Sequence, residues 1–158
     1  MSGKLRRQFR TRALEQPVVL IVHQDRDTRE MYAEFLRRHR IVVLTHERAE
    51  EALRVATLAD AIVTDLRLPG TMDGLQLIAR VRADDRTAEA TIIVLTASVF
   101  SRDRAAAAAA GADTFLPMPC LPHDLLKHLH SSLAPPSAAT RRHGNREDAH
   151  AAPEKRTA

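Results

Sequence analysis

The chain has 158 residues, of which 44% are hydrophobic, and this is enough for one domain with a hydrophobic core. With 28% charged residues and no apolar run near the ~20 residues of a membrane span, we expect no insertion in a bilayer. The net charge is +4, but residues 1–16 hold five Lys or Arg and one Glu, whereas residues 17–133 are slightly acidic. The basic balance therefore gives little support for nucleic-acid binding by the domain itself.

The first part of the middle segment alternates apolar runs with helical patterns. Val18–His23 is predicted as a strand, and Asp27 followed by Glu30 predicts a capping box at the start of the next helix. Ile41–Thr45 is predicted as a second strand, and alanine and leucine residues then recur at helical spacing over 49–56.

The alternation continues along the chain. Ala61–Asp65 is predicted as the third strand, and apolar residues at helical spacing over 75–81 follow a Pro-Gly turn. Thr91–Thr96 is predicted as the fourth strand, before a strongly helix-forming stretch over 104–110 that Gly111 is expected to end. Nearly continuous aliphatic runs in three of the strands are typical of a parallel sheet covered on both faces.

The last repeat and the ends of the chain complete the organisation. Asp113–Leu116 is predicted as the fifth strand, and Pro122 as the first residue of a final helix. Five strand–helix repeats indicate an α/β fold. We expect one domain over residues 17–133, a basic and flexible N-terminal tail over 1–16, and a disordered C-terminal tail over 134–158, which has no large apolar residue.

In an open parallel α/β sheet, functional groups gather beyond the carboxyl ends of the strands. Asp65 is the most informative of these positions, because an acid that closes a buried run is costly unless solvent or a partner receives it. An ordinary strand-end aspartate that caps the next turn is the alternative. The candidate site residues at this edge are His23, Gln24, Asp25, Asp65, Thr96, Ala97, Met118 and Pro119.

Three segments resemble bacterial response-regulator receiver domains of the chemotaxis-regulator type. Residues 61–74 (AIVTDLRLPGTMDG) are similar to the phospho-acceptor stretch, and residues 92–98 (IIVLTAS) to the fourth strand with its hydroxyl residue. Residues 111–120 (GADTFLPMPC) resemble the fifth strand, where an aromatic residue precedes a Lys-Pro pair. The resemblance implies a flavodoxin-like receiver fold: a doubly wound, five-stranded parallel sheet of order 2-1-3-4-5 with five flanking helices.

The resemblance also assigns roles to individual residues. Asp65 matches the phospho-acceptor, and Thr96, Ala97 and Phe115 match the switch positions. The family's pair of acids after the first strand, which binds magnesium together with the acceptor, is replaced here. The residues that depart from the family pattern are His23 and Gln24 at the acid pair, Asp25 one place too late, and Met118, followed by Pro119, at the lysine.

These departures predict a degenerate phosphorylation pocket. We therefore assign no cofactor and expect magnesium to bind only weakly, with Asp25 and Asp65 as weak ligands at most. Without the metal and the lysine, phosphoryl transfer should slow by roughly a thousandfold. His23 is expected to pair with Asp65; a transition-metal site that uses both is the alternative.

The expected function is that of a single-domain, atypical response regulator in a two-component phosphorelay. It would act in the cytoplasm through contacts with a histidine kinase or another signalling protein, as a non-enzyme apart from self-catalysed phosphoryl transfer and dephosphorylation at Asp65. The single cysteine, Cys120, fits a reducing compartment. The alternative is a slow phosphoacceptor at Asp65 that takes phosphate from a histidine kinase.

The sequence gives less support to a third function, nucleic-acid binding through the Arg-rich N-terminus. That segment has one aromatic residue, Phe9, and no DNA-binding motif. The sequence leaves the oligomeric state open.

Overall fold

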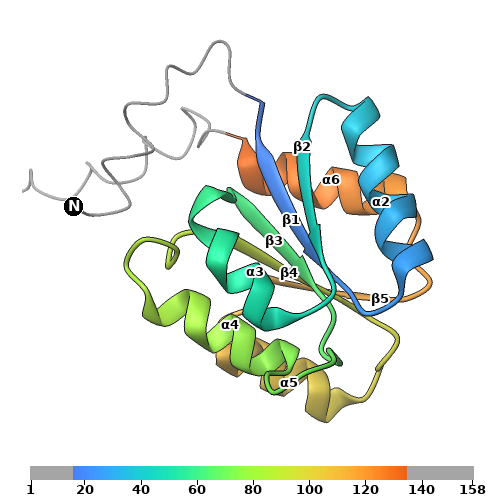
Figure 1. Cartoon of the computed structure of the whole chain (residues 1–158). Helices are drawn as coiled ribbons and strands as arrows, with labels where there is room; N and C mark the ends of the chain where they lie inside the picture. Colours follow the sequence, from blue (N-terminus) through green and yellow to red (C-terminus); the bar gives the residue numbers. More distant parts are fainter. Residues whose placement is uncertain (1–15, 135–158) are drawn as a thin grey trace, which may run out of the picture.

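The computed structural model of the protein describes residues 16–134, so the expectations for the two tails lie largely outside the described residues. Five parallel strands form one sheet in the order β2-β1-β3-β4-β5, which confirms the predicted fold class and strand order (Figure 1). The strands are β1 (Val18–Val22), β2 (Val42–His46), β3 (Ala61–Thr64), β4 (Thr91–Thr96) and β5 (Thr114–Pro117).

Helices cover both faces of the sheet, as the continuous apolar strands predict (Figure 1). One face packs against α2 (Arg26–Arg38) and α6 (Pro122–Leu133). The other packs against α3 (Ala49–Val55), the short 3₁₀ helix η1 (Ala56–Leu58), α4 (Gly74–Ala83) and α5 (Ser101–Ala110). Within residues 16–134, none of the helices has both the length and the apolar character needed to span a membrane.

The central strands end one residue earlier than predicted, and this leaves polar residues at the rim of the sheet. β1 ends at Val22 and β3 at Thr64. The backbone N–H of His23 still donates to His46 O at 3.2 Å, and that of Asp65 donates to Val22 O at 3.0 Å. The backbone of both residues is thus held by the sheet while their side chains reach its carboxyl edge.

Helix ends also position this edge, and one of them differs from the prediction. The N-cap of α2 is Asp25, not Asp27, so the predicted capping box is wrong. The backbone is extended at Asp25 and already helical at Arg26, which places Asp27 inside the first turn. Gly111 ends α5 with a left-handed φ of 114°, as expected.

Candidate functional site

Asp65 follows β3 and is almost fully buried, with 5% of its surface exposed. Its Oδ1 accepts a hydrogen bond of 2.7 Å from the N–H of Leu66. Gly74, the first residue of α4, packs so closely behind it that a Cβ there would lie 2.1 Å from the carbonyl oxygen of Asp65. The turn after β3 therefore requires glycine at 74 and fixes the backbone that carries the Asp65 carboxylate.

His23 follows β1 and lies beside Asp65, because β1 and β3 are neighbours in register. Its Nε2 is 3.6 Å from Asp65 Oδ2, and 7% of the residue is exposed. The other ring nitrogen, Nδ1, accepts a hydrogen bond of 3.1 Å from the backbone N–H of Asp25. A nitrogen that accepts carries no proton, so the neutral ring holds its proton on Nε2, the atom that faces Asp65.

Gln24 and Asp25 are exposed, and the Asp25 carboxylate is used by the helix that it caps. Its Oδ2 accepts from the backbone N–H of Thr28 at 3.3 Å and from the Thr28 hydroxyl at 3.1 Å. The backbone hydrogen bond from Thr28 is the main reason that the pKa of Asp25 is lowered. Over residues 16–134, no three His, Cys, Asp or Glu side chains are grouped closely enough to hold a metal ion.

Thr96 and Ala97 lie at the end of β4, on the same edge of the sheet. Thr96 is 1% exposed, and its hydroxyl oxygen accepts a hydrogen bond of 3.2 Å from the N–H of Ser98. Ala97 is exposed. The Ser98 hydroxyl contacts the carboxylate of Asp103 on α5, a link that the sequence analysis did not anticipate.

Phe115 and Met118 leave the region of β5 on opposite sides of the sheet. Phe115 packs on the apolar cluster beneath α3, α4 and α5, and the guanidinium carbon of Arg104 lies 4.8 Å from the centre of its ring. Met118 packs on the cluster beneath α2 and α6. Its N–H donates to Thr96 O at 2.8 Å, and the peptide bond to Pro119 is cis.

One cation near the site was missed by the sequence analysis. Arg29, in the first half of α2, donates from Nη1 to the carbonyl oxygen of His23 at 2.6 Å and reaches that of Gln24 at 3.4 Å. The spacing of six residues between Arg29 and His23 could have suggested it, because the first turn of α2 folds back over the end of β1. The contact fixes the loop backbone beside Asp65.

Comparisons with known proteins point to one family. The model of the response regulator receiver domain matches residues 19–130. The chain is 37% identical over 120 residues to the protein PetR of Rhodobacter capsulatus, an alignment that covers 74% of this chain and 48% of PetR. The chain thus spans about half the length of that relative.

Solved structures agree with this assignment. The chemotaxis response regulator CheY4 of Vibrio cholerae superposes with a TM-score of 0.69 at 28% identity, over 75% of this chain and 99% of CheY4. The receiver domain of the sensor histidine kinase PA1611 from Pseudomonas aeruginosa, which has a magnesium ion in its active-site cleft, has a TM-score of 0.69 at 26% identity. That match covers 75% of this chain and 98% of the PA1611 domain.

Proposed function

Because the chain belongs to the response regulator receiver family of two-component systems, we propose that it acts through protein–protein contacts with weak or no magnesium-dependent phosphorylation. Its partner would be a histidine kinase or another signalling protein, in the cytoplasm. Receiver domains are signalling modules and in general not enzymes. Any chemistry of its own would be phosphoryl transfer and dephosphorylation at Asp65.

The observation that carries this proposal is the contact between His23 and Asp65. Where the family has a carboxylate, this chain places an imidazole with Nε2 3.6 Å from Asp65 Oδ2. In the neutral ring this nitrogen carries a proton, so it presents a donor to the carboxylate and offers no lone pair to a cation. The ring thus occupies the side of Asp65 on which a magnesium ligand would be needed.

The residues at this edge do not fit magnesium. The ion prefers near-octahedral oxygen coordination with one or two carboxylates. Asp65 supplies one carboxylate, whose Oδ1 already accepts from Leu66 N–H, and the Asp25 carboxylate is bonded to Thr28 at the start of α2. We therefore do not expect this chain to bind magnesium as the PA1611 receiver domain does.

A second source of positive charge is also missing. Phosphoryl transfer to a carboxylate depends on cations that neutralise the charge developing on the phosphoryl oxygens. At the position of the family's lysine, Met118 is uncharged and packs on the core beneath α2 and α6. Loss of both cations corresponds to a transfer that is slower by roughly a thousandfold.

A slow phosphoacceptor is the second candidate function, and specific residues favour it. Asp65 retains the acceptor carboxylate at the end of β3, and the Thr96 hydroxyl lies at the end of the neighbouring strand β4. Ala97 is small and exposed, and Phe115 is partly buried. In this second function, contacts between the chain and a histidine kinase would position the phosphoryl group and so compensate for a pocket that catalyses the transfer poorly.

Incubation with acetyl phosphate and magnesium separates the two functions. Intact-mass spectrometry follows phosphate incorporation in the wild type, in Asp65→Asn and in the restored variant His23→Asp/Gln24→Asp/Met118→Lys. We expect the restored variant to gain phosphate far faster than the wild type, and to lose this gain when Asp65→Asn is added. Wild-type incorporation at the rate of the restored variant would contradict the proposal and favour the phosphoacceptor.

A further inference from the structure

A shallow groove lies along α2, away from the edge that carries Asp65. Its volume of about 410 Å³ is near the lower end of ligand pockets, so it suits one or two side chains of a polypeptide. Its floor is apolar, and the exposed Met31 contributes to it with 47% of its surface accessible. The floor residues are Met31 and Phe35 of α2 and Pro122 at the start of α6.

The groove has an acidic border. Residues 27, 30, 31, 34, 35 and 38 recur at spacings of three and four, so they share one face of α2. The acidic residues of this face are Asp27, Glu30 and Glu34.

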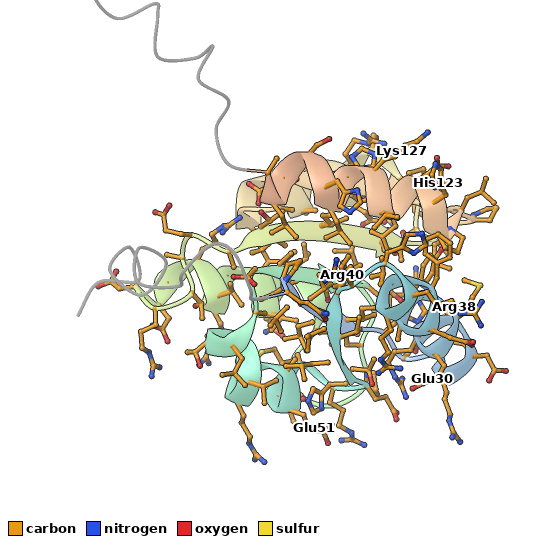
Figure 2. All side chains as sticks on the ribbon, turned by 90° about the horizontal axis from the view of Figure 1, so that it is seen from above. Glu30, Arg38, Arg40, Glu51, His123 and Lys127 are labelled. Carbon is orange, nitrogen blue, oxygen red and sulfur yellow. The ribbon has the colours of Figure 1, made fainter. Side chains whose placement is uncertain are left out.

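The acidic side chains are exposed at the surface of the molecule. Figure 2 shows Glu30 and Arg38 on α2, with His123 at the start of the neighbouring α6. Glu34 pairs with Arg38 and Glu30 with Arg37, but all four side chains are exposed, and such pairs are weak enough to exchange for another cation.

The chain itself contains a segment of complementary chemistry. Residues 1–15 hold five Lys or Arg and one acid. The large apolar residues Leu5 and Phe9 lie among these basic residues. A basic segment with an apolar pair matches a groove that has an apolar floor and an acidic border.

The point at which residues 1–15 join the domain also lies close to the groove. Pro17 O accepts from the N–H of Val42 at 2.9 Å, and Val42 follows the last residue of α2, Arg38, by four positions. The N-terminal segment thus leaves the domain next to the Arg38 end of the groove. From Arg38 to Asp27 the helix rises about 16 Å, whereas fifteen extended residues span up to roughly 50 Å.

We propose that residues 1–15 of this chain dock in the α2 groove, with Phe9 on the Met31–Phe35–Pro122 floor and basic side chains along Asp27, Glu30 and Glu34. This proposal differs from the flexible N-terminal tail that the sequence analysis expects. Because the tether gives an effective concentration in the millimolar range, a contact that would be weak between separate molecules suffices for docking.

A paramagnetic label at the N-terminus of the full-length protein tests this. Ser2→Cys in a Cys120→Ser background carries a nitroxide, and amide spectra of ¹⁵N-labelled protein report which residues are broadened. At low salt we expect selective broadening at Met31, Phe35 and His123, and its loss in 1 M NaCl, where charges are screened. No broadening at low salt, or broadening centred on other helices, would overturn the proposal.

Variants and a mixing control complete the test. Glu30→Lys/Glu34→Lys should abolish the broadening, whereas the matched pair Glu47→Lys/Glu51→Lys, exposed near α3, should retain it. Phe9→Ser leaves the described domain untouched and should also abolish it. Broadening that persists in Glu30→Lys/Glu34→Lys or in Phe9→Ser overturns the proposal. In the mixing control, ¹⁵N protein without a nitroxide is combined with ¹⁴N protein that carries one. Broadening in that mixture also overturns the proposal, because the groove would then be occupied by a second copy of the chain.

Discussion

His23 and Asp65 face each other across the carboxyl edge of the sheet, with Nε2 of the imidazole 3.6 Å from Oδ2 of the carboxylate. β1 and β3 pair in parallel register up to Val22 and Thr64, so the residue that follows each strand lies beside the other. The contact is therefore fixed by strand pairing and does not depend on a flexible loop.

The first prediction concerns the proton on His23. In its neutral form the ring should be the Nε2–H tautomer, because Nδ1 accepts from Asp25 N–H. His39 provides an internal control: its Nδ1 lies 2.9 Å from the carbonyl oxygen of Phe35, which can only accept, so it should be the Nδ1–H tautomer. Long-range ¹H–¹⁵N spectra distinguish the two forms. The Nδ1–H form at His23 would show that the ring does not present a donor to Asp65.

The second prediction concerns Asp25. Asp25→Ala should lower the thermal midpoint, because Thr28 N–H at the start of α2 loses its acceptor. Asp25→Asn should lower it less, since asparagine also caps helices, and Asp27→Ala should have a smaller effect than Asp25→Ala. Thermal unfolding followed by circular dichroism compares the three variants. A larger loss for Asp27→Ala would mean that the helix begins at the capping box predicted from the sequence.

The third prediction concerns pH and the loop between β3 and α4. Glu50 Oε1 accepts from the hydroxyl of Thr71 at 2.6 Å and from its N–H at 2.8 Å. The hydroxyl contributes most to lowering the pKa of Glu50 from 4.5 to about 2, followed by the backbone N–H groups of Glu50 and Thr71. A depressed folded-state pKa contributes stability above about pH 4.5 that is lost as pH falls towards 2.

Glu50→Gln should therefore destabilise the protein near pH 6, and the difference from wild type should shrink as pH falls to 3. Denaturant unfolding at pH 6, 4.5 and 3 measures this, with the exposed neighbour Glu51→Gln as the matched control. A difference that stays constant over this range would show that the charge of Glu50 is not what holds Thr71.

The sequence could predict the alternation of elements and the edge on which the site residues meet. Continuous aliphatic runs such as Ile92–Leu95 imply burial on both faces, and parallel strands bring His23 and Asp65 to one rim. The sequence could also have predicted that Phe115 and Met118 lie on opposite faces of the sheet. Side chains alternate between the two faces along an extended chain, and these residues are three positions apart, an odd number.

Other features of the site and of the loops around it depend on geometry that no local pattern encodes. Asp25 and Asp27 are both good helix caps, and the choice between them depends on where the backbone leaves β1. The contact between Glu50 and Thr71 joins residues 21 positions apart, and the tautomer of His23 depends on a single backbone N–H. Such contacts follow from the packed fold and could not be derived from composition or spacing.

Magnesium affinity tests the central claim most directly. Isothermal titration of the full chain with MgCl₂ should show no binding in the sub-millimolar range, because Asp25 caps α2 and the two residues before it, His23 and Gln24, supply no carboxylate beside Asp65. His23→Asp/Gln24→Asp should bind magnesium clearly more tightly, as two oxygen ligands return, and Asp65→Asn in that variant should reverse the gain. Sub-millimolar binding by the wild type, lost in Asp65→Asn, would contradict the account and show that the pocket holds magnesium despite His23.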